Sequence, residues 1–169
     1  MIVVSDTSPI LGLAVTGHLH LLEKLYGQVI LPEAVFQELT SVALVERHTR
    51  AIATLPWVQV RPVADRRFVE TLLAELDRGE AEAIAVAREV HADLLLIDER
   101  RGRRVASRFG LKLTGLIGVL AEAKKARLLL KAKPLLDDLI AKAGFGVGSE
   151  LYSRFLLEVG EQAEALHRR

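Results

Sequence analysis

The chain has 169 residues, of which half are hydrophobic and 27% are charged, and its formal net charge is +1 at pH 7. This length and composition suit one globular domain with a sizeable core and exclude a disordered or fibrous chain. The near-neutral charge does not predict a polyanion partner, so any nucleic-acid surface must be local. The absence of cysteine excludes disulfides, zinc–thiolate sites and thiol catalysis.

The apolar start of the chain does not resemble a targeting segment. Asp6 interrupts it and no basic region precedes it, so we do not expect a signal peptide. No apolar run is long enough to cross a bilayer, which argues against a membrane role. We therefore expect a cytoplasmic protein with a single domain over residues 1–169, of which residues 160–169 form a frayed tail.

Short, continuously apolar runs predict strands that are covered on both faces. They lie at Ile2–Val4, Val29–Leu31, Trp57–Val60, Leu94–Ile97 and Leu111–Leu113. Helical patterns lie between and after them, at Pro32 to Leu44 or beyond, Arg67–Leu76, Glu80–His91, Glu99–Phe109, Leu116–Leu130, Pro134–Ala143 and Ser149–Val159, the last with Ser149 as N-cap. This alternation predicts an α/β fold, a three-layer α/β/α sandwich around a parallel sheet of about five strands.

Two aspartates follow predicted strands directly. Asp6 ends the first strand and Asp98 ends the fourth, and ligands of open α/β sheets bind beyond the carboxyl ends of the strands. A carboxylate buried there needs a partner, a metal ion or a bound proton. Each residue also has an ordinary explanation, since Asp6 could cap the turn that follows it and Asp98 could N-cap the helix from Glu99.

Helical phase adds two glutamates to the candidate site. Glu38 lies on the apolar face of its predicted helix, and Glu80 lies on the apolar face of the helix that follows Gly79. Glu82 shares its face with Glu89, so we expect water around it. Glu38 could instead be half exposed, and Glu80 could simply favour the positive end of its helix.

Four carboxylates at one edge of a sheet repel one another. Each pair at ~5 Å costs roughly 3 kcal/mol at an effective dielectric constant of about 20. Such a group persists if protons or divalent cations neutralise it, and oxygen ligands without His or Cys suit Mg²⁺ or Mn²⁺, as one or two ions. An ion of this kind can activate water and stabilise the charge that develops on a phosphodiester.

Several stretches together resemble the PIN-domain family of metal-dependent ribonucleases, especially the toxin-type (VapC-like) branch of prokaryotic toxin–antitoxin systems. In order they are VVSDTSPIL, ILPEAVFQEL, LDRGEAEAIAVA, LLLIDERRGRRVA, TGLIGVLAEAKKARLL and GFGVGSELYSRFLLEVGE. The resemblance implies an α/β/α sandwich whose acidic Mg²⁺ or Mn²⁺ site cleaves single-stranded RNA. It also raises the possibility of a small antitoxin protein as partner.

Carried over residue by residue, the four acids of the family fall on Asp6, Glu38, Glu80 and Asp98. Ser8 falls where the family often has a polar residue that orients the waters of the metal. The third acid is more commonly Asp in the family, and the alignment there could shift by two residues, which makes Glu82 the substitute for Glu80. Because the side chain at this position is longer than in the commoner family pattern, an alternative interpretation is a catalytically weak or inactive PIN-like module that binds RNA or an antitoxin.

A run of arginines follows Asp98 and could bind the RNA backbone, since guanidinium groups bind phosphates bidentately. The candidates are Arg100, Arg101, Arg103 and Arg104. The alternative is a solvated helix face with local ion pairs. Aromatic residues are too sparse to predict a base-stacking platform, and we interpret GFGVG at 144–148 as a turn, because no strand precedes it.

A different metal-dependent phosphohydrolase is the second alternative. Haloacid-dehalogenase-like phosphatases carry Asp-x-Asp after their first strand, but here Ser8 occupies the second position. The apolar C-terminal third exceeds what the sheet requires, so part of it could form a homodimer surface or a groove for an antitoxin helix. Ordinary core for the terminal helices explains the same residues.

Overall fold

The computed structural model describes residues 1–41 and 51–162. Its centre is a five-stranded parallel sheet in the order β3-β2-β1-β4-β5. The strands are β1 (Val3–Ser5), β2 (Val29–Pro32), β3 (Val58–Arg61), β4 (Leu94–Leu96) and β5 (Leu113–Thr114). Helices cover both faces, so the predicted three-layer α/β/α fold is confirmed.

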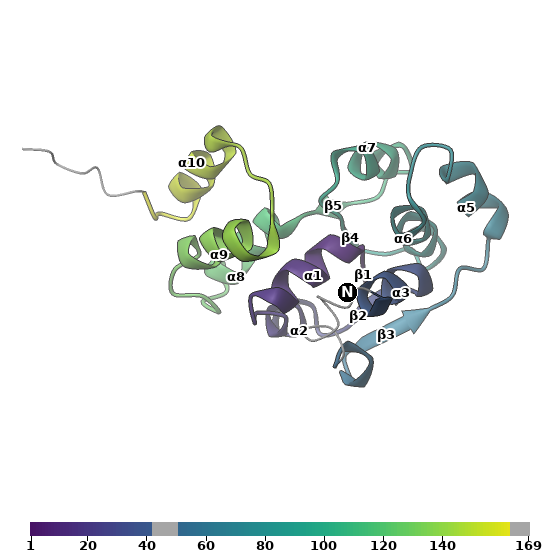
Figure 1. Ribbon diagram of the computed structural model, residues 1–169, viewed down its shortest axis with the longest axis horizontal. Coiled ribbons are helices and arrows are strands. Elements are labelled where there is room, and N and C mark those ends of the chain that lie inside the picture. Colours follow the sequence, from purple (N-terminus) through teal and green to yellow (C-terminus); the bar gives the residue numbers. More distant parts are fainter. Residues whose placement is uncertain (42–50, 163–169) are drawn as a thin grey trace, which may run out of the picture.

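The helices form two groups on either side of the strands (Figure 1). One group contains α1 (Thr7–Val15), α2 (His20–Tyr26), α8 (Leu116–Lys125), α9 (Lys133–Ala143) and α10 (Ser149–Glu158). The other contains α5 (Arg66–Leu72), α6 (Arg78–Glu89) and α7 (Arg100–Arg108). Helix α3 (Glu33–Ser41) follows β2 and packs against α6, and the short 3-10 helix η1 (Ile52–Thr54) precedes β3.

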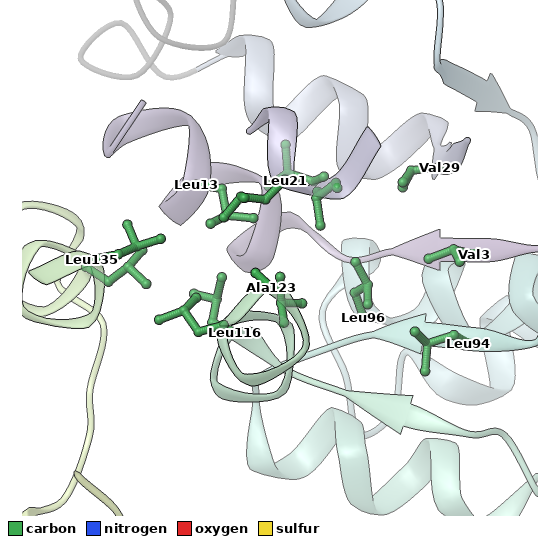
Figure 2. Packing of buried hydrophobic residues seen from close by; sticks show 14 of the residues in the cluster. Val3, Leu13, Leu21, Val29, Leu94, Leu96, Leu116, Ala123 and Leu135 are labelled. Carbon is green, nitrogen blue, oxygen red and sulfur yellow. The ribbon is translucent and has the colours of Figure 1, made fainter. Parts of the chain in front are cut away.

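Alternate residues of the strands enter opposite cores, as the period of a strand requires. Val3, Leu94 and Leu96 pack with the leucines of α1, α2, α8 and α9 (Figure 2). Val4 and Leu95, which point the other way, pack against the alanine-rich face of α6 and the buried side of α7. Burial on both faces explains why the strand sequences read as unbroken apolar runs.

Helices α1 and α2 were not predicted from the sequence. Helix α1 starts at Thr7, directly after Asp6, and its nearly uniform apolar sequence lacks the periodicity that marks an amphipathic helix. Helix α8 ends at Lys125 rather than Leu130, because the chain reaches a positive φ at Arg127. The N-cap of α10 is Gly148, so the predicted cap at Ser149 is wrong. Residues 42–44 of the predicted helix from Pro32 lie outside the described residues.

The end of the described chain is tied to the preceding helices. Glu161 accepts hydrogen bonds from the backbone N–H groups of Ala132 and Lys133 at 2.7 and 3.1 Å, and forms an ion pair with Lys124 at 2.9 Å. The rest of the predicted tail, residues 163–169, lies outside the described residues. No helix in the described ranges is long and apolar enough to cross a membrane.

Candidate active site

Asp6 lies at the carboxyl end of the central strand, where β1 passes into α1. Its backbone N–H donates to the Leu96 carbonyl at 2.9 Å, which fixes the end of β1 against β4. The side chain is only 3% exposed. Burial raises the pKa of Asp6 to about 7; a hydrogen bond from the Thr7 backbone opposes the rise, and the nearby carboxylates of Asp77, Glu80 and Glu38 add to it. Among residues 1–41 and 51–162, no cation forms an ion pair with this buried acid.

Asp98 follows the neighbouring strand. Ser5 pairs with Leu96, so Asp6 and Asp98 both lie just beyond the paired ends of adjacent strands. One carboxylate oxygen, Oδ1, accepts the Leu116 N–H at 2.9 Å at the start of α8, while Oδ2 is buried and has no hydrogen-bond partner among the described residues. Burial raises the pKa of this carboxyl group as well. Asp98 therefore caps α8 rather than α7 and keeps one oxygen free to bind a ligand.

Glu38 is brought to the site by α3 and held by a residue next to Asp6. The Thr7 hydroxyl donates to Oε2 of Glu38 at 2.5 Å. The same carboxylate lies against Gly79 at the start of α6, where any Cβ would overlap its oxygens. Gly79 is thus needed for the close approach of Glu38 to α6. Sequence analysis identified Glu38 but not the roles of Thr7 and Gly79.

Glu80 and Asp77 form a capping box at the start of α6. The Glu80 N–H donates to Oδ1 of Asp77 at 2.8 Å, and the Asp77 N–H donates to Oε2 of Glu80 at 3.2 Å. Glu80 is 7% exposed, and its pKa is raised by burial and by the charge of Asp77. Asp77 was missed because an aspartate before a helix is explained by capping alone.

Glu82 contradicts the expectation that water surrounds it. Its side chain is fully buried, and Oε2 forms ion pairs with Arg66 at 3.0 Å and Arg78 at 3.3 Å. Oε1 accepts the Ala34 N–H at 3.1 Å, which ties the start of α3 to α6. Because α3 and α5 cover this side of α6, a face that reads as polar in the sequence is enclosed. Glu82 is a neutralised structural carboxylate.

We name the group without such pairing the acidic edge; it consists of Asp6, Glu38, Asp77, Glu80 and Asp98. All its potential ligands are carboxylate oxygens, which suit a hard divalent cation, and the orphaned Oδ2 of Asp98 and the protonatable Asp6 fit that chemistry. Over residues 1–41 and 51–162, however, no three His, Asp or Glu side chains are gathered closely enough to hold an ion. Local hydrogen bonds hold Glu38, Glu80 and Asp98 in separate positions.

The four candidate arginines divide into different environments. Arg103 donates to the Ile97 carbonyl at 2.8 Å and so supports the chain just before Asp98. Arg101 donates to the Glu75 carbonyl at 3.2 Å, and the charge of Arg104 also acts on the Glu75 side chain. Arg100 is exposed and has no hydrogen bond or ion pair in the described part of the chain. It lines the hollows beside both Asp98 and Glu80, which makes it the cation best placed to meet a ligand.

A cavity of about 320 Å³ opens beside the acidic edge. Its lining includes Ser8 and Asp98 together with the segment 143–146. The sequence pattern did not place this segment at the site, because it lies at the end of α9, 45 to 48 residues beyond Asp98. The only available signal was the glycine pair around Phe145, which we interpreted as a turn.

Comparison with known families identifies the architecture. A family model described as a PIN domain matches residues 2–161, nearly the whole chain. The chain belongs to the PIN-domain family. A search of curated proteins found no match. PIN domains are generally nucleases that use divalent metal ions, and the carboxylate oxygens of the acidic edge are donors of the kind that a hard cation prefers.

Proposed function

We propose that the protein is an Mg²⁺- or Mn²⁺-dependent endoribonuclease that cleaves single-stranded RNA. One observation supports the proposal most strongly. Asp6 is buried at the carboxyl end of the central strand, beside the other acids of the acidic edge and without an ion pair in the described part of the chain. A buried anionic group of this kind is costly unless it binds protons or metal. PIN-domain membership makes metal-assisted phosphodiester hydrolysis the reaction that best fits it.

The chain's own residues would divide the work as follows. Asp6 and Asp98 would bind the ion directly, while Glu38 and Glu80 would bind it or hold its waters, with one or two ions in total. When bound, the ion would polarise water and stabilise charge on the phosphodiester. Ser8 would orient water at the site, and Arg100 would bind the phosphate that enters, with Arg101, Arg103 and Arg104 extending the positive rim.

The biological setting belongs to the same proposal. A cytoplasmic toxin of a toxin–antitoxin pair, bound by a small antitoxin and active as a homodimer, is the setting that the resemblance favours. Much of the apolar C-terminal third is accounted for as core, since Leu135 and Leu136 are buried. The exposed Leu130 and Leu157 remain available to a partner or a second copy.

One observation favours a second candidate. Because no three described acids are gathered closely enough to hold an ion, a PIN-like module that binds RNA or an antitoxin without turnover also fits the geometry. In that case Glu80 would serve mainly as part of the capping box. The two candidates differ in one property, metal-dependent cleavage.

Cleavage of single-stranded RNA with Mn²⁺, with Mg²⁺ and with EDTA tests the proposal. Wild-type protein should cleave only with a divalent ion, and Asp6→Asn should lose cleavage while its circular dichroism spectrum is unchanged. Asp138→Asn is the matched control, because Asp138 is a surface acid on α9 whose ion pair is with Lys142. Metal-independent cleavage, or full activity in Asp6→Asn, would contradict the proposal. RNA binding without cleavage would favour the binding module.

A further inference from the structure

Phe145 is an aromatic residue that lies at a cavity rather than fully inside the hydrophobic core. It is half buried, and it lines the cavity beside Asp98 as well as a second cavity of about 550 Å³ toward β5. The two cavities share four residues, namely Asp98, Arg100, Phe145 and Gly146. Phe145, the exposed Arg100 and Asp98 of the acidic edge therefore border the same space.

The backbone around Phe145 supports this placement. Gly144 ends α9 in the left-handed region with φ of 68°, and the Phe145 N–H donates to the Leu139 carbonyl at 3.0 Å. This anchored turn sets the position of the ring. A Cβ at Gly146 would meet nothing within 4 Å, so the chain beside the ring is open to a ligand.

We propose that Phe145 and Arg100 form a nucleotide-binding subsite, in which the ring of Phe145 stacks on an unpaired base and Arg100 binds an adjacent phosphate. The inference rests on the proposed function, because it gives the RNA a path into the acidic edge. Stacking on a protein ring requires a base that is not paired in a duplex, so the subsite selects single-stranded RNA. Arg100 offsets the negative potential of the acids at the point where a phosphate must approach.

Other occupants fit less well. The lining of the cavity is mixed: Leu11 and Leu116 are apolar, but Asp98, Glu99 and Arg100 interrupt the continuous apolar surface that a docked protein helix would need. A nucleotide presents an apolar face together with an anionic group, which matches the ring of Phe145 and the guanidinium group of Arg100.

Binding of a fluorescent single-stranded oligoribonucleotide with one 2-aminopurine, measured in EDTA so that no metal-dependent cleavage occurs, tests the subsite. Phe145→Leu should weaken binding about tenfold and abolish the quenching of 2-aminopurine, because leucine keeps apolar volume but cannot stack. Phe145→Trp should retain both, and Arg100→Gln should weaken binding and reduce its salt dependence.

Two matched controls lie away from both cavities. Phe109→Leu removes a partly exposed ring that contacts Phe68, and Arg67→Gln removes an exposed cation on α5. Neither should change RNA binding. Equal affinity of wild type and Phe145→Leu, equal binding of duplex and single strand, or no binding by the wild type would overturn the inference. Binding through Phe145 by a protein that never cleaves would refute the proposed nuclease alone.

Discussion

Glu82 and Asp6 are both buried carboxylates, but among the described residues only Glu82 has cationic partners. Glu82 has two arginines and a backbone N–H as partners. The charged groups that act on Asp6 in the described part of the chain are acids, namely Asp77, Glu80 and Glu38. Both are enclosed, so burial by itself does not separate structure from function. The difference between the two residues is the presence of cationic partners, because a buried acid without such a partner is costly unless it binds a ligand.

The largest expected effect concerns the pH dependence of stability without metal. Because the folded state raises the pKa of Asp6 from 3.8 to about 7, the folded protein holds this proton more tightly than the unfolded chain does. The free energy of unfolding should therefore fall as pH rises from about 4 to about 7, by up to about 4 kcal/mol from this residue.

Asp6→Asn removes that titration, so the variant should be more stable than wild type above pH 7 in EDTA. Urea unfolding at several pH values measures the difference, and adding Mn²⁺ at pH 8 should stabilise wild type alone. If the difference in unfolding free energy between wild type and Asp6→Asn does not change with pH, Asp6 is not an unpaired buried acid and does not differ from Glu82 in this respect.

The next largest effect is expected at Glu82. Glu82→Ala should lower the free energy of unfolding by about 2 kcal/mol, because it leaves the Ala34 N–H without its buried acceptor and removes the ion pairs to the half-exposed Arg66 and Arg78. Glu82→Gln should lose less, since an amide oxygen can still accept the Ala34 N–H. Chemical denaturation measures both. A variant as stable as wild type would show that the pairing is not structural.

Substitution of Asp77 should give the smallest effect. Asp77 has a structural role as the N-cap of α6, and its charge also raises the pKa of Asp6. Asp77→Ala removes the N-cap of α6 and should cost about 1 kcal/mol, whereas Asp77→Ser keeps a capping oxygen and should cost only a few tenths. Both variants remove a charge that raises the pKa of Asp6, so both should lower that pKa. Thermal unfolding and NMR titration of the Asp6 carboxyl group check the two effects. An unchanged pKa would place Asp77 outside the acidic edge.

The sequence predicted those parts of the molecule that depend on local patterns. The strands are continuous apolar runs, and Asp6 and Asp98 could be placed because each directly follows one. Helical phase also placed Glu80 on an inward face, whereas Glu38, which the pattern placed there too, is half buried. These inferences needed no knowledge of which helices lie side by side.

The errors arise where distant segments meet. Glu82 looks polar in its helix and becomes enclosed only because α3 and α5 pack there, bringing Arg66 and Ala34 to it. Phe145 reads as a turn residue because its neighbours Asp98 and Arg100 are remote in sequence. Helix α1 is buried too completely to show a periodic pattern. Each case depends on tertiary packing rather than on local preference.

Binding of Mn²⁺ to the full-length protein at pH 8, measured by isothermal titration calorimetry, tests the central claim most directly. We predict saturable binding by the wild type. Binding should be strongly weakened in Asp98→Asn, which loses the charge beside the orphaned oxygen, and unchanged in Asp138→Asn. Absence of saturable binding, or equal affinity in wild type and Asp98→Asn, would contradict a metal-binding role for the acidic edge.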